Sequence, residues 1–303
     1  MSTMSKFNFY LLHPKYFFIW ILVLLMYVLA KFPLKAKRFI GAIIGNLSFL
    51  FLKKTQKTIV TNISLCLPEI PKKDQKKITA KVLNNYGHSL VEVSSAWFAT
   101  EQSINEAFHI ENPELLQRAI SHQKAIIIGT AHFTCLELGL AKASMIFNRY
   151  AGMYRKAKNP VLEHVMFQSR HRRGCEMIAH DNVRALIKKL RSNYATVYLP
   201  DQPDFDSPTD LLPFFGNPCV TNTAVSKIAK LGHAIILPMC MRFDRSLSKY
   251  VLTFYPFFEP NNDVDDTKKL LSIFENYISE YPEQYIWGYK KFKQRPLCFK
   301  QVY

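Results

Sequence analysis

The chain has 303 residues, of which 49% are hydrophobic and 14% aromatic. This composition excludes a disordered or low-complexity chain, because so many apolar side chains would be left in contact with water. The length fits one large globular domain or two small ones. Lys and Arg total 40 against 23 Asp and Glu, so the formal net charge is +17. Such an excess indicates an anionic partner, meaning nucleic acid, anionic lipid or a phosphorylated substrate.

The positive charge is concentrated in the N-terminal third of the chain. Residues 1–100 contain 14 Lys and Arg but 3 Asp and Glu, which places +11 of the net charge there. The cysteines lie far apart with no Cys-x-x-Cys pair, which fits neither a disulfide framework nor a thiolate zinc site. We therefore expect the globular part to occupy a reducing compartment. The six cysteines are Cys66, Cys135, Cys175, Cys219, Cys240 and Cys298.

The N-terminal part begins with fifteen consecutive apolar or aromatic residues, Tyr16 to Ala30. A membrane span usually needs about 20 such residues, so this run is short. It is not followed by the small-residue cleavage pattern of a signal peptide. The basic residues that follow it, beginning with Lys31 and Lys35, are typical of the cytoplasmic side of a membrane. We therefore predict a membrane-anchoring helix within residues 1–35, with the remainder of the chain in the cytoplasm.

A second apolar segment, Phe39 to Leu52, is interrupted by glycines. It is too short to cross a bilayer comfortably and favours an interfacial or core helix. We predict an interfacial helix over 36–60 at the start of a single α/β domain, 36–303, with its catalytic core at 125–300. The alternative for both apolar segments is a pair of buried core helices.

From residue 125 onward, short apolar runs typical of strands alternate with helical patterns. One helix is expected from a cap at Asp181 to about Ser192, and another from about Asn222 to Lys230, ending at Gly232. Alternation of strand and helix predicts a largely parallel central sheet with helices on both faces. The expected strands are Ala125–Gly129, Tyr150–Tyr154, Met177–Ala179, Ala195–Leu199, Ala234–Met241 and Tyr250–Tyr255.

The residues most suggestive of chemistry follow the strand Ala125–Gly129, where reactive groups gather in such sheets. His132 and Glu137 are five residues apart, so on one continuous helix their side chains would diverge by about 140°. If His132 instead precedes a helix that begins near Thr134, Glu137 in the first turn can reach the imidazole. The carboxylate would then orient the ring, and His132 would act as a general base.

Structural alternatives exist for each of these residues. Thr134 and Glu137 also fit a capping box, in which the glutamate only satisfies a backbone amide. His132 fits a hydrogen-bonded core histidine equally well. Cys135 raises the possibility of a Cys–His nucleophile, although a thiol in that position is poorly aimed and better suits a small buried apolar residue.

Beyond the His-x4-Glu pattern, ordered motifs over 240 residues resemble those of one family, the late acyltransferases of lipid A biosynthesis. The form around His132, His132-Phe133-x-x-Leu136-Glu137, looks most like the lauroyl-type branch. The resemblance implies a glycerolipid-acyltransferase-like version of the α/β fold. The remaining motifs are residues 61–69, 154–160, 170–172, 199–202, 213–216 with Thr221 and Thr223, 282–287 and 291–296.

The resemblance also implies an activity, partners and a location. A fatty acyl chain would pass from acyl carrier protein to the hydroxyl of a 3-hydroxyacyl chain on a Kdo-bearing lipid A precursor. His132 would be the general base and Glu137 would orient it, with no metal or cofactor. The expected partners are acyl carrier protein, the lipid A precursor and anionic lipid of the inner membrane, but no nucleic acid. The catalytic domain would lie on the cytoplasmic face of the Gram-negative inner membrane.

Four further residues are expected to bind substrate. Arg155 and Arg170 match arginines of the family, and a guanidinium can bind phosphate through two hydrogen bonds. Arg172 lies with Arg170 in a basic cluster, residues 170–173, that favours an anion site over a surface salt bridge. Asp201 follows an expected strand, where it could meet the active site or merely cap a turn. Lys290, Lys291, Lys293 and Arg295 fit either an anion-binding face or a solvated one.

The chain departs from the family pattern in the loop 203–207 and in Thr134-Cys135 after the histidine, which leaves the acyl chain length open. One rival hypothesis is a glycerol-phosphate or lysophosphatidate acyltransferase with the same His-x4-Glu chemistry, although the motif at 282–287 argues against it. The other is a non-catalytic basic protein that binds a membrane surface and would tolerate loss of His132.

Overall fold

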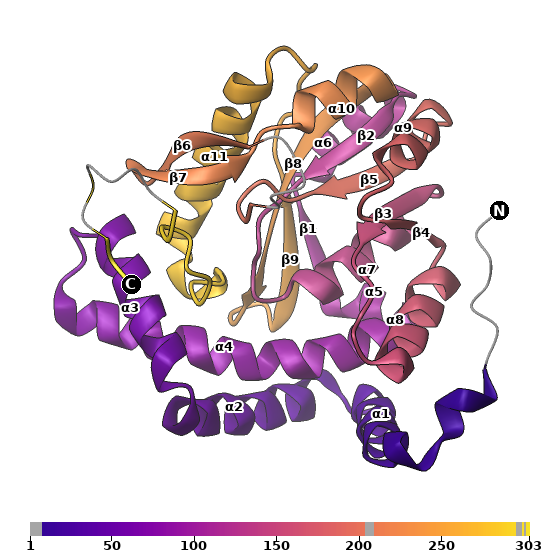
Figure 1. The fold of residues 1–303 in the computed structure, drawn as a ribbon, viewed down its shortest axis with the longest axis vertical. Coiled ribbons are helices and arrows are strands. Elements are labelled where there is room, and N and C mark those ends of the chain that lie inside the picture. Colours follow the sequence, from indigo (N-terminus) through magenta and orange to yellow (C-terminus); the bar gives the residue numbers. More distant parts are fainter. Residues whose placement is uncertain (1–7, 204–208, 295–298, 300) are drawn as a thin grey trace.

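The computed structural model describes residues 8–203, 209–294, 299 and 301–303. Figure 1 shows a central sheet between two layers of helices, with the N-terminal helices packed beneath one layer. The sheet has seven strands in the order β1-β9-β8-β2-β5-β3-β4, and β6 and β7 form a separate two-stranded sheet. The strands are β1 (Phe108–Glu111), β2 (Ala125–Gly129), β3 (Tyr150–Tyr154), β4 (Cys175–Ala179), β5 (Ala195–Tyr198), β6 (Thr209–Phe214), β7 (Asn217–Asn222), β8 (Ala234–Asp244) and β9 (Lys249–Phe254).

The central sheet is largely parallel, which confirms the predicted fold class. Strands β8, β2, β5, β3 and β4 all run in one direction, and only β8 and β9 pair antiparallel within this sheet. β2 lies between β8 and β5, and every one of its residues is buried. A strand buried on both faces is an uninterrupted apolar run, as the sequence Ala-Ile-Ile-Ile-Gly shows.

Two layers of helices cover this sheet. Helices α9, α10 and α11 pack together on one face, and α4, α7 and α8 pack together on the other. α5 and α6 come before and after β1 in the chain. The helices are α4 (Lys72–Phe98), α5 (Glu101–Ala107), α6 (Pro113–Ser121), α7 (Leu136–Ile146), α8 (Pro160–Arg172), α9 (Val183–Arg191), α10 (Val225–Gly232) and α11 (Asp263–Glu280).

The N-terminal part forms three helices, and α2 packs along α4 (Figure 1). Glycines on both helices permit this close approach. A Cβ atom on Gly87 of α4 would lie 2.1 Å from the backbone nitrogen of Gly45 on α2, closer than any real contact. The glycines that interrupt the second apolar segment thus form a packing surface. The three helices are α1 (Phe17–Ala30), α2 (Leu34–Phe51) and α3 (Lys53–Cys66), preceded by the 3₁₀ turns η1 (Phe9–Leu12) and η2 (Pro14–Tyr16).

α1 and α2 expose most of their apolar side chains. Only Val23 and Ala30 of α1 are buried, so the alternative of two buried core helices does not fit. The predicted interfacial segment 36–60 is divided at Leu52 between α2 and α3. Within the described part of the chain, no helix combines the length and the apolar character needed to cross a membrane. The apolar residues of these two helices with the highest exposed fractions are Phe17, Phe18, Leu24, Leu25, Phe39, Leu50 and Phe51.

Differences from the predicted elements have local causes. β6 and β7 are not among the expected strands; they form a two-stranded sheet in which both strands are edges and therefore tolerate Pro213 and Pro218. The predicted cap at Asp181 is wrong: Asn182 caps α9 by accepting a hydrogen bond from the backbone of Ala185. α10 begins at Val225, later than predicted, because residues up to Asn222 belong to β7.

Candidate active site

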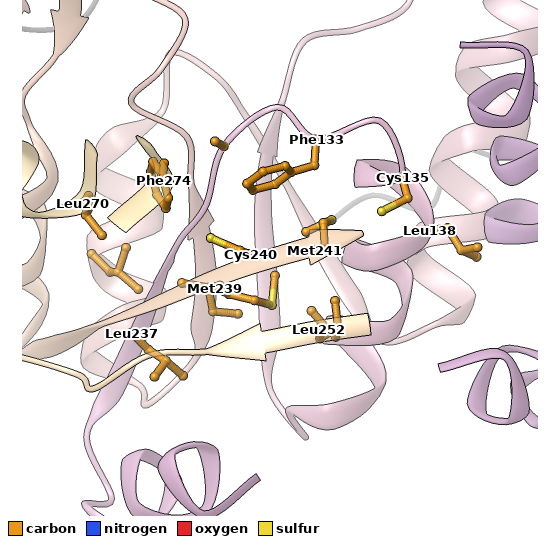
Figure 2. Close-up of a cluster of buried hydrophobic side chains, with 14 of the residues drawn as sticks. Phe133, Cys135, Leu138, Leu237, Met239, Cys240, Met241, Leu252, Leu270 and Phe274 are labelled. Carbon is orange, nitrogen blue, oxygen red and sulfur yellow. The ribbon is translucent and has the colours of Figure 1, made fainter. Parts of the chain in front are cut away.

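His132 lies in the turn that follows β2. The backbone amide of Thr130 donates to the carbonyl of Tyr198 at 3.0 Å, which extends the pairing of β2 with β5 beyond the end of the strand. Phe133 is fully buried and points into the core, where it lies over β8 near Cys240 and Met241 (Figure 2). This anchor fixes the turn, while the His132 side chain keeps 27% of its surface exposed. The histidine is therefore held rigidly but remains accessible.

Asp201 is the partner of the His132 ring. It follows β5, which runs parallel to β2 at its side, so both residues lie at the same edge of the sheet. The Nδ1 atom of His132 lies 2.8 Å from Oδ1 of Asp201, and the His132 backbone amide donates to Oδ2 at 3.0 Å. An ionised carboxylate only accepts hydrogen bonds, so Nδ1 is the donor and Nε2 is the ring atom that can take up a proton.

Asp201 carries its charge in the interior, where its side chain has no exposed surface. Burial by itself raises the pKa of its carboxyl. The charge and hydrogen bonds of His132, together with the charge of Lys291, outweigh burial and lower that pKa to about 2. Asp201 is therefore an ionised acceptor at neutral pH, able to stabilise a positive charge that forms on His132.

Glu137 has different partners from those predicted. It lies in the first turn of α7, where Nη2 of Arg170 donates to both its oxygens at 2.7 and 2.9 Å. The indole of Trp97 donates to Oε1 at 3.1 Å. The carboxylate that contacts the imidazole is therefore that of Asp201, and the predicted contact of Glu137 with His132 is wrong. The capping box is wrong as well, because α7 begins at Leu136 and its N-cap is Cys135.

Cys135 and the basic cluster 170–173 have structural contacts. Cys135 is buried against the sheet (Figure 2), and burial raises the pKa of its thiol, which fits the small apolar residue and not a nucleophile. Arg172 is exposed, and its Nη2 donates to the carbonyl of Trp97 at 3.1 Å. Arg173 is buried and donates to the carbonyls of Ala96 and Ala99. This cluster thus holds α8 against the end of α4.

Arg155 directly follows β3 and is exposed. Because β3 runs parallel to β5, Arg155 lies at the same edge of the sheet as His132 and Asp201. The structure therefore brings His132, Asp201 and Arg155 to one edge. Arg170 and Glu137 form a separate ion pair between α8 and α7, with about a quarter of each side chain exposed.

This ion pair lines one part of an apolar cavity of about 180 Å³. Glu137 and Arg170 lie in its wall, together with Leu136 of the same turn of α7. The cavity extends between α7 and strands β3, β4 and β5, where small and flexible side chains leave room. These residues are Leu140, Ala141, Gly152, Met153, Met177 and Val197. Its size and apolar wall suit a hydrocarbon chain.

The segment 282–291 completes the site from the far end of the sequence. The amide of Thr134 donates to the carbonyl of Gln284 at 2.7 Å, and that of Ile286 donates to the carbonyl of His132 at 2.9 Å. Tyr285 and Lys291 contact Asp201, which the sequence did not reveal. The sequence pointed to these two residues only through the motifs 282–287 and 291–296, which contain them. Lys290 and Lys293 are exposed, whereas Lys291 is buried. Arg295, Cys298 and all but Pro203 of the loop 203–207 lie outside the described residues.

A histidine–carboxylate pair at the carboxyl edge of a parallel sheet, with an apolar cavity nearby, is the arrangement expected of an α/β enzyme that acts on a lipid-like substrate. The chain belongs to the family of bacterial lipid A biosynthesis acyltransferases, whose family model matches residues 4–294. It is an O-acyltransferase of lipid A biosynthesis. The family resemblance drawn from the motifs is thereby confirmed.

Three relatives from Escherichia coli (strain K12) illustrate the range of the family. The chain is 28% identical to the lipid A biosynthesis palmitoleoyltransferase over 100% of both chains. It is 26% identical to the lauroyltransferase over 98% of both chains. It is 22% identical to the myristoyltransferase over 93% of this chain and 89% of the relative. Their names differ in the acyl group transferred, so membership of the family does not specify the length of that acyl group.

The lowered pKa of Asp201 predicts a pH-dependent contribution to stability. Because the folded-state pKa of about 2 is below the ordinary value of 3.8, the contribution is complete above pH 4 and is lost as the pH falls towards 2. It amounts to about 2 kcal/mol. We expect the free energy of unfolding, measured by chemical denaturation from pH 2 to 6, to differ between wild type and Asp201→Asn by an amount that shrinks over this window. A difference that does not change with pH would contradict the assignment.

Proposed function

We propose that the chain transfers a fatty acyl group from the thioester of acyl carrier protein to the hydroxyl of a 3-hydroxyacyl chain on a Kdo-bearing lipid A precursor, with His132 as the general base. The observation that carries this proposal is the hydrogen bond between Nδ1 of His132 and the buried carboxylate of Asp201. It leaves Nε2 as the proton acceptor on a ring that is partly exposed. Membership of the lipid A acyltransferase family supports a lipid A precursor as the acceptor.

The proposed step is a direct transfer with no acyl-enzyme. Nε2 of His132 accepts the proton of the substrate hydroxyl while the hydroxyl oxygen attacks the thioester carbonyl. The carbon–sulfur bond then breaks, and the imidazolium returns the proton to the leaving thiolate. The products are the ester and the free thiol of the carrier protein. Asp201 stabilises the imidazolium between these steps, and a base positioned in this way accelerates a reaction by about 10²- to 10⁴-fold.

Glu137 serves the same reaction through Arg170. Its carboxylate binds Nε and Nη2 of the guanidinium, which fixes the arginine in the wall of the apolar cavity. We propose that this pair places the donor chain in the cavity with its thioester towards His132. Arg155 and Arg172 are both exposed, and we propose that they contact the phosphates or the acidic sugars of the acceptor.

The apolar cavity is the proposed site of the transferred chain. Its wall at Gly152 carries no side chain, and a Cβ atom placed there would meet only Sγ of Cys175 at 3.5 Å. The depth of the cavity near this glycine would therefore limit the length of the chain. Each buried methylene contributes about 0.8 kcal/mol, or roughly a factor of four in affinity.

The exposed apolar faces of α1 and α2 are the proposed membrane contact. Both helices direct large apolar side chains to the surface, and Lys31 and Lys35 lie beside them. Apolar insertion combined with attraction to anionic lipid is the usual basis of such binding. A cytoplasmic location on the inner membrane would give the site access to acyl carrier protein and to the lipid acceptor together.

Removal of the base should abolish turnover. We expect His132→Ala to reduce kcat/KM by about 10²- to 10⁴-fold in a micellar assay with acyl carrier protein thioesters and the Kdo-bearing precursor. The control is His109→Ala, an exposed histidine on the edge strand β1. If His132→Ala retains its rate, or if wild type acylates only lysophosphatidate or glycerol phosphate, the proposal is wrong.

Filling the apolar cavity should shorten the preferred acyl chain. We expect Gly152→Leu to move the optimum of a donor panel to chains several methylenes shorter, with Gly152→Ala giving a smaller shift in the same direction. The ratio of kcat/KM between short and long donors measures this effect. A folded Gly152→Leu variant with the donor preference of wild type would place the acyl chain elsewhere.

Charges introduced on the apolar face of α1 should weaken membrane binding. We expect Phe18→Asp combined with Leu25→Asp to reduce binding to vesicles that contain phosphatidylglycerol by more than about tenfold, because each buried large side chain contributes about 1.5–3 kcal/mol. Leu247→Asp, at an exposed leucine between β8 and β9, is the control. Equal sedimentation of the double variant and wild type with vesicles would contradict the proposal.

A further inference from the structure

The Asp201 carboxylate is surrounded by donors from two parts of the chain. Oδ1 faces Nδ1 of His132, and Oδ2 accepts from the His132 amide and from the phenol of Tyr285 at 2.9 Å. The carbonyl oxygen of Asp201 accepts from Nζ of Lys291 at 2.5 Å. Thus both His132 and the segment 282–291 contact Asp201, and they share the oxygen Oδ2.

Tyr285 is held in place as a hydrogen-bond donor. It is 3% exposed, and its backbone pairs with that of Phe133 in the turn beside His132. Its ring packs against Trp287, with 5.0 Å between ring centroids. Burial and the charge of Asp201 both raise the pKa of the phenol, so Tyr285 keeps its proton over the range in which the enzyme works. The phenol therefore remains able to donate its hydrogen bond to Oδ2.

Lys291 brings a positive charge to the same place. Its side chain is buried, and its ammonium group lies 4.3 Å from the centre of the Phe214 ring. A buried ammonium is expensive unless it is paired, and here it is bonded to the backbone of a residue that carries a negative charge. It therefore favours the ionised form of Asp201 and fixes the backbone at that position.

We propose that Tyr285 and Lys291 are positioning residues of the acyl transfer, which keep Asp201 ionised and hold its carboxylate in the orientation that receives Nδ1 of His132. Neither residue needs to touch the substrates. The inference rests on the proposed role of His132 as the base. The experiment distinguishes an error in that role from an error in the positioning role of Tyr285 and Lys291. It also gives the segment 282–291 a part in the chemistry in addition to its packing.

The consequence is a defined change in the pH profile. The Tyr285 phenol takes up part of the negative charge on Oδ2. Without it, the carboxylate stabilises the imidazolium more strongly, so a higher pH is needed to release the base. The orientation of the ring is also less fixed, which lowers the maximal rate. The titratable groups that act on Asp201 or on Tyr285 are His132, Lys291, Tyr289, Cys66 and Cys219.

Tyr86 provides a matched control. Its phenol accepts a hydrogen bond at 2.8 Å from the backbone amide of Gly288, within the segment that carries Tyr285. Tyr86→Phe therefore removes one buried hydrogen bond to this segment and leaves the Asp201 carboxylate with all its donors. A purely structural role of Tyr285 would make the two phenylalanine variants behave alike.

The test measures kcat and KM from pH 5 to 9 for wild type, Tyr285→Phe, Tyr86→Phe and His132→Ala. We expect Tyr285→Phe to lower kcat about tenfold, as for a hydrogen bond to a charged group. Its acid limb should move to higher pH by about half a unit, with KM for both substrates unchanged. Tyr86→Phe should keep the wild-type profile. An unshifted profile in Tyr285→Phe, or the same shift in Tyr86→Phe, overturns the inference.

Two further comparisons complete the experiment. Lys291→Gln removes the charge and should also shift the acid limb upwards, whereas Lys291→Arg should restore it, so this pair decides the question if Tyr285→Phe does not fold. Equal profiles for the two lysine variants overturn the inference. If His132→Ala is active, the proposed base is wrong. If it is inactive while Tyr285→Phe retains the wild-type profile, only the positioning role is wrong.

Discussion

The buried negative charge of Asp201 imposes a condition on two distant parts of the chain. An uncompensated charge in the interior costs on the order of several kcal/mol, so the carboxylate must be surrounded by donors before it can be ionised there. His132 supplies two of these donors from the turn after β2, and the Tyr285 phenol supplies another from the last part of the chain. Lys291 donates to the backbone carbonyl of Asp201 and adds a positive charge beside the carboxylate. The same contacts aim the imidazole. The hydrogen bonds that allow Asp201 to be ionised in the interior thus also fix the orientation of the His132 ring.

Two carboxylates lie near the start of α7, and their surroundings separate their roles. Asp201 is fully buried and pairs with the His132 ring, whereas Glu137 is partly exposed and forms an ion pair with Arg170. The His-x4-Glu spacing therefore connects two different contacts: the histidine at the edge of the sheet with Asp201, and the glutamate with the arginine in the wall of the apolar cavity. An enzyme that joins an acyl chain to a hydroxyl needs both contacts next to each other, and five residues of chain keep them so.

Helix α4 connects this site with the surface formed by α1 and α2. It packs on α2 through Gly87, and Ser89 on the same helix donates to the carbonyl of Thr134 beside His132. Near its end, Trp97 donates to Glu137. One long helix thus sets the distance between the proposed membrane contact and the reacting groups. Acceptors embedded in a bilayer would meet the site at a height fixed by this packing.

The sequence by itself determined the class of fold, the strands Ala125–Gly129 and Tyr150–Tyr154, and the family, because apolar periodicity and local motifs are encoded within short stretches. It also singled out His132 as a candidate for the active site. It placed Asp201 after the correct strand without revealing its partner. Only the tertiary structure decided that Asp201 and not Glu137 contacts the imidazole, and that Tyr285 and Lys291 complete the site. Those contacts join residues 69 to 90 positions apart in the chain. Such pairings follow from strand order and from the path of the final segment, which no local pattern specifies.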